Sequence, residues 1–306
     1  MSSPSNLLVI GLPGTGKTTF LAALWHVAES EEIPNSLRLL RISDDARHLN
    51  SIKNEWQLFR PVGRSIVEPA QHASLLVRDP IQGMEGEIVF PDLSGESFRD
   101  QWKTRQWTHG FQRLVDASRS ILLFVNPDKV VEPFSVAEMQ RMMQVVFPAF
   151  QARAEELQIL GTEDGADEAQ GPERGTEEWN PELAPTQVQL VGLLQFLEPH
   201  FLPRRPARLA VIISAWDRVM KSGREHPTPD EWLSARLPYL HQYLLSQEEL
   251  FRAQVWGISA QGGDLNADIA TLREIDPASH RIHVEGPNGI SHDITEPVSW
   301  ALGWRR

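Results

Sequence analysis

The 306-residue chain contains no cysteine. This absence excludes disulfide bonds and thiolate metal sites, and it fits a reducing compartment. Long apolar runs are also lacking, since no stretch reaches the roughly 18 residues that a transmembrane helix needs. Residues 1–6 carry no basic side chain, and the apolar run at 7–10 is too short for a signal peptide. These absences predict a cytoplasmic protein without a membrane span.

Basic residues are scarce, because 29 lysines and arginines face 41 aspartates and glutamates, for a formal net charge of −12. This balance argues against direct binding to nucleic acid. Much of the negative charge falls at residues 155–182, where ten acidic residues accompany one arginine. That segment is also rich in Gly, Thr and Pro, so we expect an acidic, disordered insertion. It is either a solvated surface loop or an arm that binds a partner.

Apolar runs of strand type alternate with helical patterns, which is typical of an α/β fold with a mostly parallel sheet. The expected strands are residues 7–10, 37–42, 73–77, 87–90, 121–125, 209–213 and 254–258, with a last strand and helix after 283. The expected helices are residues 18–29, a segment capped by Ser43 or Asp44, 183–202 and 232–245. In the second helix, apolar residues recur at steps of three and four through Trp56 and Phe59.

The order of these elements predicts a doubly wound sheet with helices on both faces. We expect one domain over residues 1–306. It would contain a strand–helix insertion near 36–60 and the acidic insertion near 155–182.

Residues 11–18, GLPGTGKT, match the phosphate-binding P-loop pattern G-x-x-x-x-G-K-[ST]. They follow an apolar strand and open a helix, which is the context the motif requires. Backbone N–H groups of such a loop surround a phosphate, and the helix N-terminus adds its positive end. Lys17 is expected to reach the β- and γ-phosphates as a catalytic residue, and Thr18 to bind Mg²⁺. The predicted nucleotide-binding residues here are Gly11, Gly14, Thr15, Gly16, Lys17, Thr18 and Thr19.

A second motif, D-x-x-G, follows the strand at 87–90 and spans Asp92 to Gly95. A carboxylate at a strand end can hold Mg²⁺ through its hydration water, so Asp92 is predicted to act opposite Thr18. The Gly95 amide is predicted to bind the γ-phosphate and thereby report its presence.

Two polar clusters, residues 214–217 and 259–261, follow the strands at 209–213 and 254–258. Ligands of open α/β sheets bind at the carboxyl ends of strands, so both clusters are expected at the nucleotide. Asp217 can accept hydrogen bonds from the N1–H and N2 amino groups of guanine, which adenine lacks. Ser259 and the backbone N–H of Ala260 are expected at the guanine carbonyl oxygen, although each cluster could instead cap a helix.

In this order, the four motifs resemble those of Ras-like GTPases of the translation-factor-related class, over residues 6–128 and 205–263. Residues 92–98 and 292–295 also resemble bacterial double-GTPase proteins, which are thought to act in paired-GTPase conflict or signalling systems. The resemblance implies a molecular switch that binds GTP or GDP with Mg²⁺ and hydrolyses GTP. It also implies a protein partner, which is a second GTPase, an effector or an activating protein.

The chain departs from the pattern of these GTPases in its base motif and its first switch. N-K-x-D becomes Ser214-Ala215-Trp216-Asp217, so the lysine that covers the base is missing. Trp216 either packs near the base or belongs to the core. Residues 21–103 contain no threonine to close on Mg²⁺, and Ser65 is the predicted substitute ligand.

Glu96 stands where these GTPases usually keep a glutamine that positions water, and it is the second predicted catalytic residue. Its carboxylate can orient water but also repels the γ-phosphate. We therefore expect slow hydrolysis until a partner supplies positive charge. Three arginines flank the expected switches and are candidates to supply that charge in cis: Arg64, Arg99 and Arg105.

Two other functions remain open. The lack of a switch threonine and the presence of Glu96 also fit a nucleotide-binding regulatory subunit with little or no hydrolysis. An ATP-dependent P-loop enzyme is the other possibility, although Leu93 occupies the position after Asp92 where motor ATPases usually carry glutamate.

Overall fold

The structure is a computed structural model that describes residues 5–42, 46–62, 73–91, 95–133, 181–201, 206–221 and 226–305. The chain divides into two compact units, residues 1–130 with 186–306 and residues 131–185. Of the smaller unit, the structure describes a short 3₁₀ turn, Pro181–Leu183 (η2). The expected acidic insertion therefore lies almost entirely outside the described residues.

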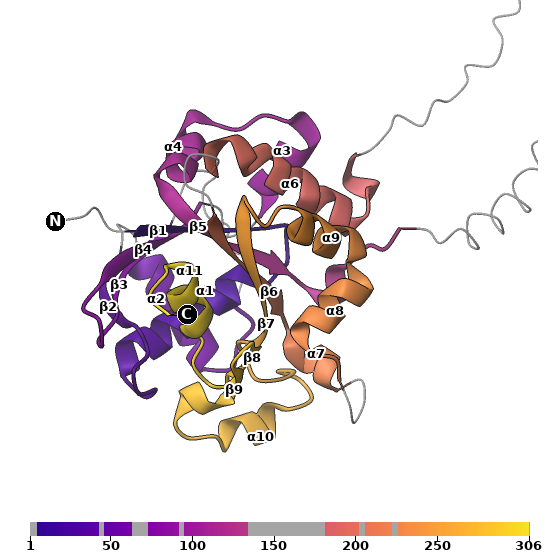
Figure 1. Ribbon diagram of the computed structural model, residues 1–306. Coiled ribbons are helices and arrows are strands. Elements are labelled where there is room, and N and C mark those ends of the chain that lie inside the picture. The colour runs from indigo at the N-terminus through magenta and orange to yellow at the C-terminus, as the bar shows by residue number, and fades with distance from the viewer. Residues whose placement is uncertain are drawn as a thin grey trace, which may run out of the picture. The chain divides into compact units, whose positions relative to one another are not determined.

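Within the described part of the larger unit, nine strands form one mixed sheet in the order β2-β3-β4-β1-β5-β6-β7-β8-β9 (Figure 1). The strands are Ser5–Gly11 (β1), Arg38–Ile42 (β2), Ala73–Arg78 (β3), Glu85–Phe90 (β4), Ser118–Val125 (β5), Ala207–Ser214 (β6), Phe251–Ser259 (β7), His283–Gly286 (β8) and Gly289–Ser291 (β9). The five central strands, β4 to β7 in that order, are parallel, and the two strands at each edge are antiparallel. The predicted α/β fold is confirmed.

Helices cover both faces of the sheet (Figure 1). Lys17–Ser30 (α1), Ala46–Gln57 (α2) and Glu296–Ala301 (α11) pack on one face. The other face carries Glu96–Thr104 (α3), His109–Ala117 (α4), Thr186–Phe201 (α6), Trp216–Met220 (α7), Pro229–Arg236 (α8) and Pro238–Ser246 (α9). Short turns of helix at Pro127–Lys129 (η1), Ile269–Arg273 (α10) and Ala278–Arg281 (η4) complete the described elements.

Towards their carboxyl ends the central strands are mainly apolar, as is typical of strands that are buried on both faces. In β1, Leu7 and Val9 join the core beneath α1, whereas Leu8 and Ile10 join the core beneath α6. All four are at most 1% exposed. Such strands hold their carboxyl ends rigidly in one row, and the P-loop and both polar clusters follow those ends.

The single helix predicted over 232–245 is wrong, because the segment forms two helices, α8 and α9. Leu237 separates them with φ −133° and ψ 55°. A residue that precedes proline avoids helical dihedrals, and Pro238 then starts the next helix at its first position. Thr228 begins α8 with a capping box to Glu231.

Helix α2 also ends earlier than its apolar spacing predicts. Phe59 lies beyond the helix with φ 57°, in the left-handed region. Arg60 N–H donates to the Glu55 carbonyl at 2.9 Å and Phe59 N–H to the Trp56 carbonyl at 3.2 Å. This pair of bonds is the Schellman motif, which usually places glycine at the left-handed position. The predicted cap residues 43 and 44 lie outside the described residues.

The other predicted strands and helices lie within a few residues of the observed ones. The expected hairpin around residues 79–83 joins β3 to β4. At the C-terminal end, a β8–β9 hairpin precedes α11, where the sequence predicts one strand and one helix. Across the described ranges, we find no helix both long and apolar enough to cross a membrane.

Candidate nucleotide site

The P-loop connects β1 to α1 and turns through left-handed glycines. Gly16 immediately precedes α1 with φ 84°, and a Cβ at this position would lie 3.0 Å from Ser214 Cβ. Glycine is therefore required both for the backbone conformation and for the close approach of β6. This turn aims the first N–H groups of α1 at the loop, which is the geometry that binds phosphate.

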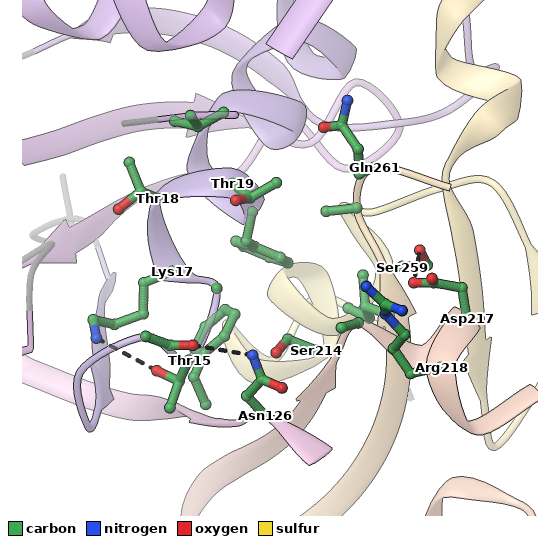
Figure 2. A pocket seen from close by; sticks show the side chains of 18 of the residues that line it. Thr15, Lys17, Thr18, Thr19, Asn126, Ser214, Asp217, Arg218, Ser259 and Gln261 are labelled. Carbon is green, nitrogen blue, oxygen red and sulfur yellow. Dashed lines mark hydrogen bonds between the residues drawn. The ribbon is translucent and has the colours of Figure 1, made fainter. Parts of the chain in front are cut away.

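The Lys17 ammonium folds back onto the P-loop (Figure 2). Its Nζ donates to the carbonyl oxygens of Gly11 at 2.8 Å and Leu12 at 3.0 Å, and to Thr15 Oγ1 at 3.4 Å. The residue is 2% exposed, so these carbonyls replace the hydration of a buried cation.

Asn126 ties the end of β5 to the P-loop, a contact that the sequence analysis missed. Its Nδ2 donates to the Gly14 carbonyl at 3.0 Å (Figure 2). Its Oδ1 accepts from Asp128 N at 2.9 Å. The signal was available, since Asn126 directly follows a buried strand, as the polar clusters after β6 and β7 do. The carboxyl end of β5 thus helps to set the shape of the phosphate loop.

The two polar clusters meet at the opposite end of the site. Ser259 Oγ donates to Asp217 Oδ1 at 2.6 Å, and it also accepts from Gly262 N at 3.1 Å. Asp217 is 6% exposed and Ser259 1% exposed. The pair therefore joins the start of α7 to the loop after β7, and it fixes the direction of the Asp217 carboxylate (Figure 2).

Trp216 belongs to the core, one of the two alternatives for this residue. It is fully buried, its ring fills the space above Gly257, and its indole N–H donates to Glu285 Oε2 at 2.8 Å. Ala215, in the position of the missing lysine, lines the cavity with φ 48°. Arg218, the residue after the motif, also lines the cavity and pairs with Asp264 at 2.6 Å.

A cavity of about 470 Å³ connects the P-loop to the Asp217–Ser259 pair. This volume falls within the usual range for a small-molecule site. Its walls come from the phosphate loop, the ends of β5 and β6, the segment after α2 and the loop after β7. The lining includes Gly14, Thr15, Gly16, Lys17, Thr18, Thr19, Pro61, Val62, Asn126, Ala215, Asp217, Ser259, Ala260 and Gln261.

Gly95 packs directly against the P-loop with φ 82°. A Cβ on Gly95 would lie 2.6 Å from Lys17 Nζ, 2.7 Å from the carbonyl carbon of Leu12 and 2.8 Å from Gly11 O. The next residue, Glu96, starts α3 and forms a close ion pair with Arg99. Segment 95–99 therefore begins directly beside the P-loop.

The remaining predicted residues have different outcomes. Ser65, Arg64 and Asp92 lie outside the described residues. Arg105 stacks its guanidinium 4.2 Å from the centre of the Trp102 ring, at the end of α3. Within the described segments, no group of three or more His, Asp or Glu residues is arranged to hold a metal ion.

Comparisons with known proteins give one family and several similar solved structures, two of which are described here. The family model for Double-GTPase 1 matches residues 8–301. The chain is similar to a bacterial selenocysteine-specific elongation factor, EF-Sec, with TM-score 0.35 and 11% identity over 91% of this chain and 30% of that chain. It is also similar to the signal recognition particle receptor SRb-GTP/SRX complex from Chaetomium thermophilum, with TM-score 0.34 and 12% identity over 85% and 92% of the two chains. No curated protein matches.

The chain thus spans about 30% of the elongation factor's length. The family match covers nearly all of the sequence, including the P-loop and both polar clusters. It confirms the predicted resemblance to the double-GTPase proteins. The chain belongs to the Double-GTPase 1 family.

Proposed function

We propose that this chain is a GTP-binding molecular switch. It hydrolyses GTP slowly with Mg²⁺, and the rate of hydrolysis rises when a protein partner binds. The observation that carries the proposal is the single cavity that joins a P-loop to the buried Asp217–Ser259 pair. One end offers a lysine and helix N–H groups to phosphates, and the other offers a fixed carboxylate to a base.

Asp217 carries the preference for guanine. Its carboxylate accepts from N1–H and the N2 amino group, and Ser259 holds it in that direction. The backbone N–H of Ala260 binds the guanine carbonyl oxygen. Adenine offers neither the N2 amino group nor that oxygen, so it would leave buried polar groups unpaired, which is costly.

Mg²⁺ fits the side of the cavity that Thr18 lines, because magnesium prefers oxygen ligands such as a hydroxyl and phosphate oxygens. Thr18 would hold the ion with Asp92 and Ser65. When bound, Mg²⁺ would neutralise charge that develops on the β- and γ-phosphate oxygens. Lys17 would bind the same phosphates, and Gly11, Gly14, Thr15, Gly16 and Thr19 would complete the loop around them.

Slow hydrolysis follows from two contacts. Lys17 Nζ is held by P-loop carbonyls, so nucleotide must displace it before it can stabilise the γ-phosphate. Glu96, which would orient the attacking water, is engaged by Arg99 and adds negative charge beside the phosphate. A partner that draws Arg99 toward the phosphate would free Glu96 and supply positive charge in one movement.

The proposed partner is a second GTPase, an effector or an activating protein. We further infer that the parallel core is doubly wound and that one nucleotide-binding domain spans residues 1–306, with insertions near 36–60 and 155–182. The absence of cysteine supports a cytoplasmic location. The net charge of −12 argues against direct contact with nucleic acid.

The test is phosphate release from GTP and Mg²⁺ under single-turnover conditions. The wild type alone should turn over on the order of 10⁻³ per second or more slowly. Glu96→Gln removes the charge but keeps the shape, so it should hydrolyse faster, whereas Glu249→Gln, at an exposed remote position, should match the wild type. Rapid turnover by the isolated wild type would refute the slow switch.

A second candidate, a nucleotide-binding regulatory subunit with little hydrolysis, is favoured by the same Lys17 contacts. It predicts tight GTP binding with no phosphate released by the wild type or by Glu96→Gln during prolonged incubation. An ATP-dependent enzyme is distinguished by base preference, because it would bind adenine nucleotides at least as tightly as guanine nucleotides.

A further inference from the structure

The loop that follows β7 is held by a helix far away in sequence. Trp56, in α2, is fully buried and donates its indole N–H to the carbonyl oxygen of Ala260 at 2.9 Å. Ser259, the preceding residue, is fixed by its bond to Asp217. The Trp56 bond holds the peptide group that follows Ala260, and the Asp217 bond holds the side chain of the residue before it, so the two contacts restrict the Ala260 backbone from both sides.

Arg281, in η4, in turn holds Trp56. Its guanidinium carbon lies 3.6 Å from the centre of the Trp56 ring, and Nη2 donates to the Trp56 carbonyl oxygen at 2.6 Å. The residue is 3% exposed. Burial lowers the pKa of Arg281 to about 10, so the group stays protonated at neutral pH and keeps its cation–π contact.

The backbone of Arg281 also contacts the loop directly. A Cβ at Gly262 would lie 2.2 Å from the Arg281 carbonyl oxygen, so only glycine permits this approach. Helix α2 and η4 therefore hold residues 259–262 through one hydrogen bond from a buried indole and one close backbone contact.

Phe59 also contacts Arg281, and it does so from a strained backbone conformation. It occupies the left-handed position of the Schellman motif, where a residue with a Cβ is less favourable than glycine. Its ring lies 4.3 Å from the Arg281 guanidinium carbon. A strained phenylalanine at a position suited to glycine indicates that the side chain is needed for its contact with Arg281 and not only to end the helix.

We propose that Trp56, held by Arg281, which Phe59 also contacts, is a positioning residue for the guanine base, acting through the Ala260 backbone. The inference rests on the proposed guanine binding at Asp217. It adds that α2 sets the backbone N–H that meets the guanine carbonyl oxygen. The same helix leads into Pro61 and Val62, which line the cavity, so it supports two walls of the nucleotide site.

The contact controls how long the base stays bound. A net hydrogen bond contributes roughly 0.5–1.5 kcal/mol, and losing it frees the Ala260 backbone. Affinity changes within one complex appear mainly in the dissociation rate. Loss of the indole N–H therefore accelerates GDP release about three- to tenfold.

The test compares Trp56→Phe with Trp25→Phe, measuring release of GDP and IDP by stopped flow alongside thermal stability. Trp25 is a matched control: it is 1% exposed in α1, and its indole nitrogen has no hydrogen-bond partner within the described residues. Inosine diphosphate (IDP) has the same base carbonyl oxygen as GDP but lacks the N2 amino group. Trp56→Phe should therefore accelerate release of both nucleotides equally, and Trp25→Phe should accelerate neither.

Phe59→Gly keeps the inference testable if Trp56→Phe does not fold. Glycine relieves the left-handed strain but removes the ring beside Arg281, so the variant should release GDP faster without losing stability. A purely structural role would not combine these two effects. Release at the wild-type rate in the folded variants, or equal acceleration in Trp25→Phe, overturns the inference. If the guanine assignment itself is wrong, the wild type will show no preference for GDP over ADP, so the two failures can be distinguished.

Discussion

Replacing Gly95 with alanine tests the contact between segment 95–99 and the P-loop. At φ 82° an alanine loses roughly 1–2 kcal/mol relative to glycine. The new Cβ would also stand 2.7 Å from the Leu12 carbonyl carbon and 2.8 Å from Gly11 O. Lys17 can swing its flexible end away, but those backbone atoms cannot move without distorting the loop, so residue 95 must retreat from it.

The matched control is Gly83→Ala, because Gly83 has φ 68° and nothing within 4 Å of an added Cβ. This control carries the left-handed strain without the clash. We expect Gly83→Ala to lose about 1–2 kcal/mol of stability. Gly95→Ala should lose about 1–3 kcal/mol more, since overpacking adds that much, which lowers the melting temperature by roughly 5 °C or more in total.

The functional effect should be larger than the stability effect. Gly95 does not line the cavity, so GDP affinity should stay within about twofold of the wild type. GTP hydrolysis should fall at least about tenfold, because the γ-phosphate loses the Gly95 amide. Single-turnover phosphate release and fluorescent GDP titration measure the two quantities. Wild-type hydrolysis by Gly95→Ala, with a stability loss no greater than that of Gly83→Ala, would refute the reasoning.

Three further perturbations have defined outcomes. Asn126→Ala removes the bond to the Gly14 carbonyl, so GDP affinity measured by titration should fall about three- to tenfold; an unchanged affinity would rule out a role for Asn126 in shaping the loop. Burial lowers the pKa of His26 and of His283, so the unfolded chain gains protons near pH 6.5 that the folded chain does not. Stability in urea should therefore decline from pH 7 to pH 5, and a flat profile would contradict this assignment. Chelation of Mg²⁺ should stop GTP turnover and speed nucleotide release; turnover that persists would exclude the proposed Mg²⁺ dependence.

The strand–loop–helix at the P-loop could be predicted because its glycines, lysine and apolar strand are contiguous. The meeting of Asp217 with Ser259 was also predictable, since both follow neighbouring parallel strands whose carboxyl ends share one edge. Asn126 obeys the same rule after β5 and was missed because it belongs to no familiar motif. Local patterns thus located the phosphate-loop wall of the cavity and the Asp217–Ser259 pair at its other end.

Contacts between distant segments were beyond the sequence. Nothing local indicates that Trp56 donates to Ala260, because its apolar spacing marks only a buried helix face. Phe59 fits that spacing yet packs from outside the helix, where tertiary contact with Arg281 outweighs backbone preference. The break before Pro238, by contrast, could have been predicted from the restriction that proline places on the backbone of the residue before it.

The most direct test of the account is the base preference that Asp217 confers. Fluorescent GDP and ADP would be titrated into the wild type, Asp217→Ala and the exposed control Asp116→Ala, with and without Mg²⁺. The account predicts that the wild type and the control prefer GDP strongly and that Asp217→Ala loses this preference while retaining phosphate-dependent binding. Equal or tighter ADP binding by the wild type, unaffected by Asp217→Ala, would contradict the account.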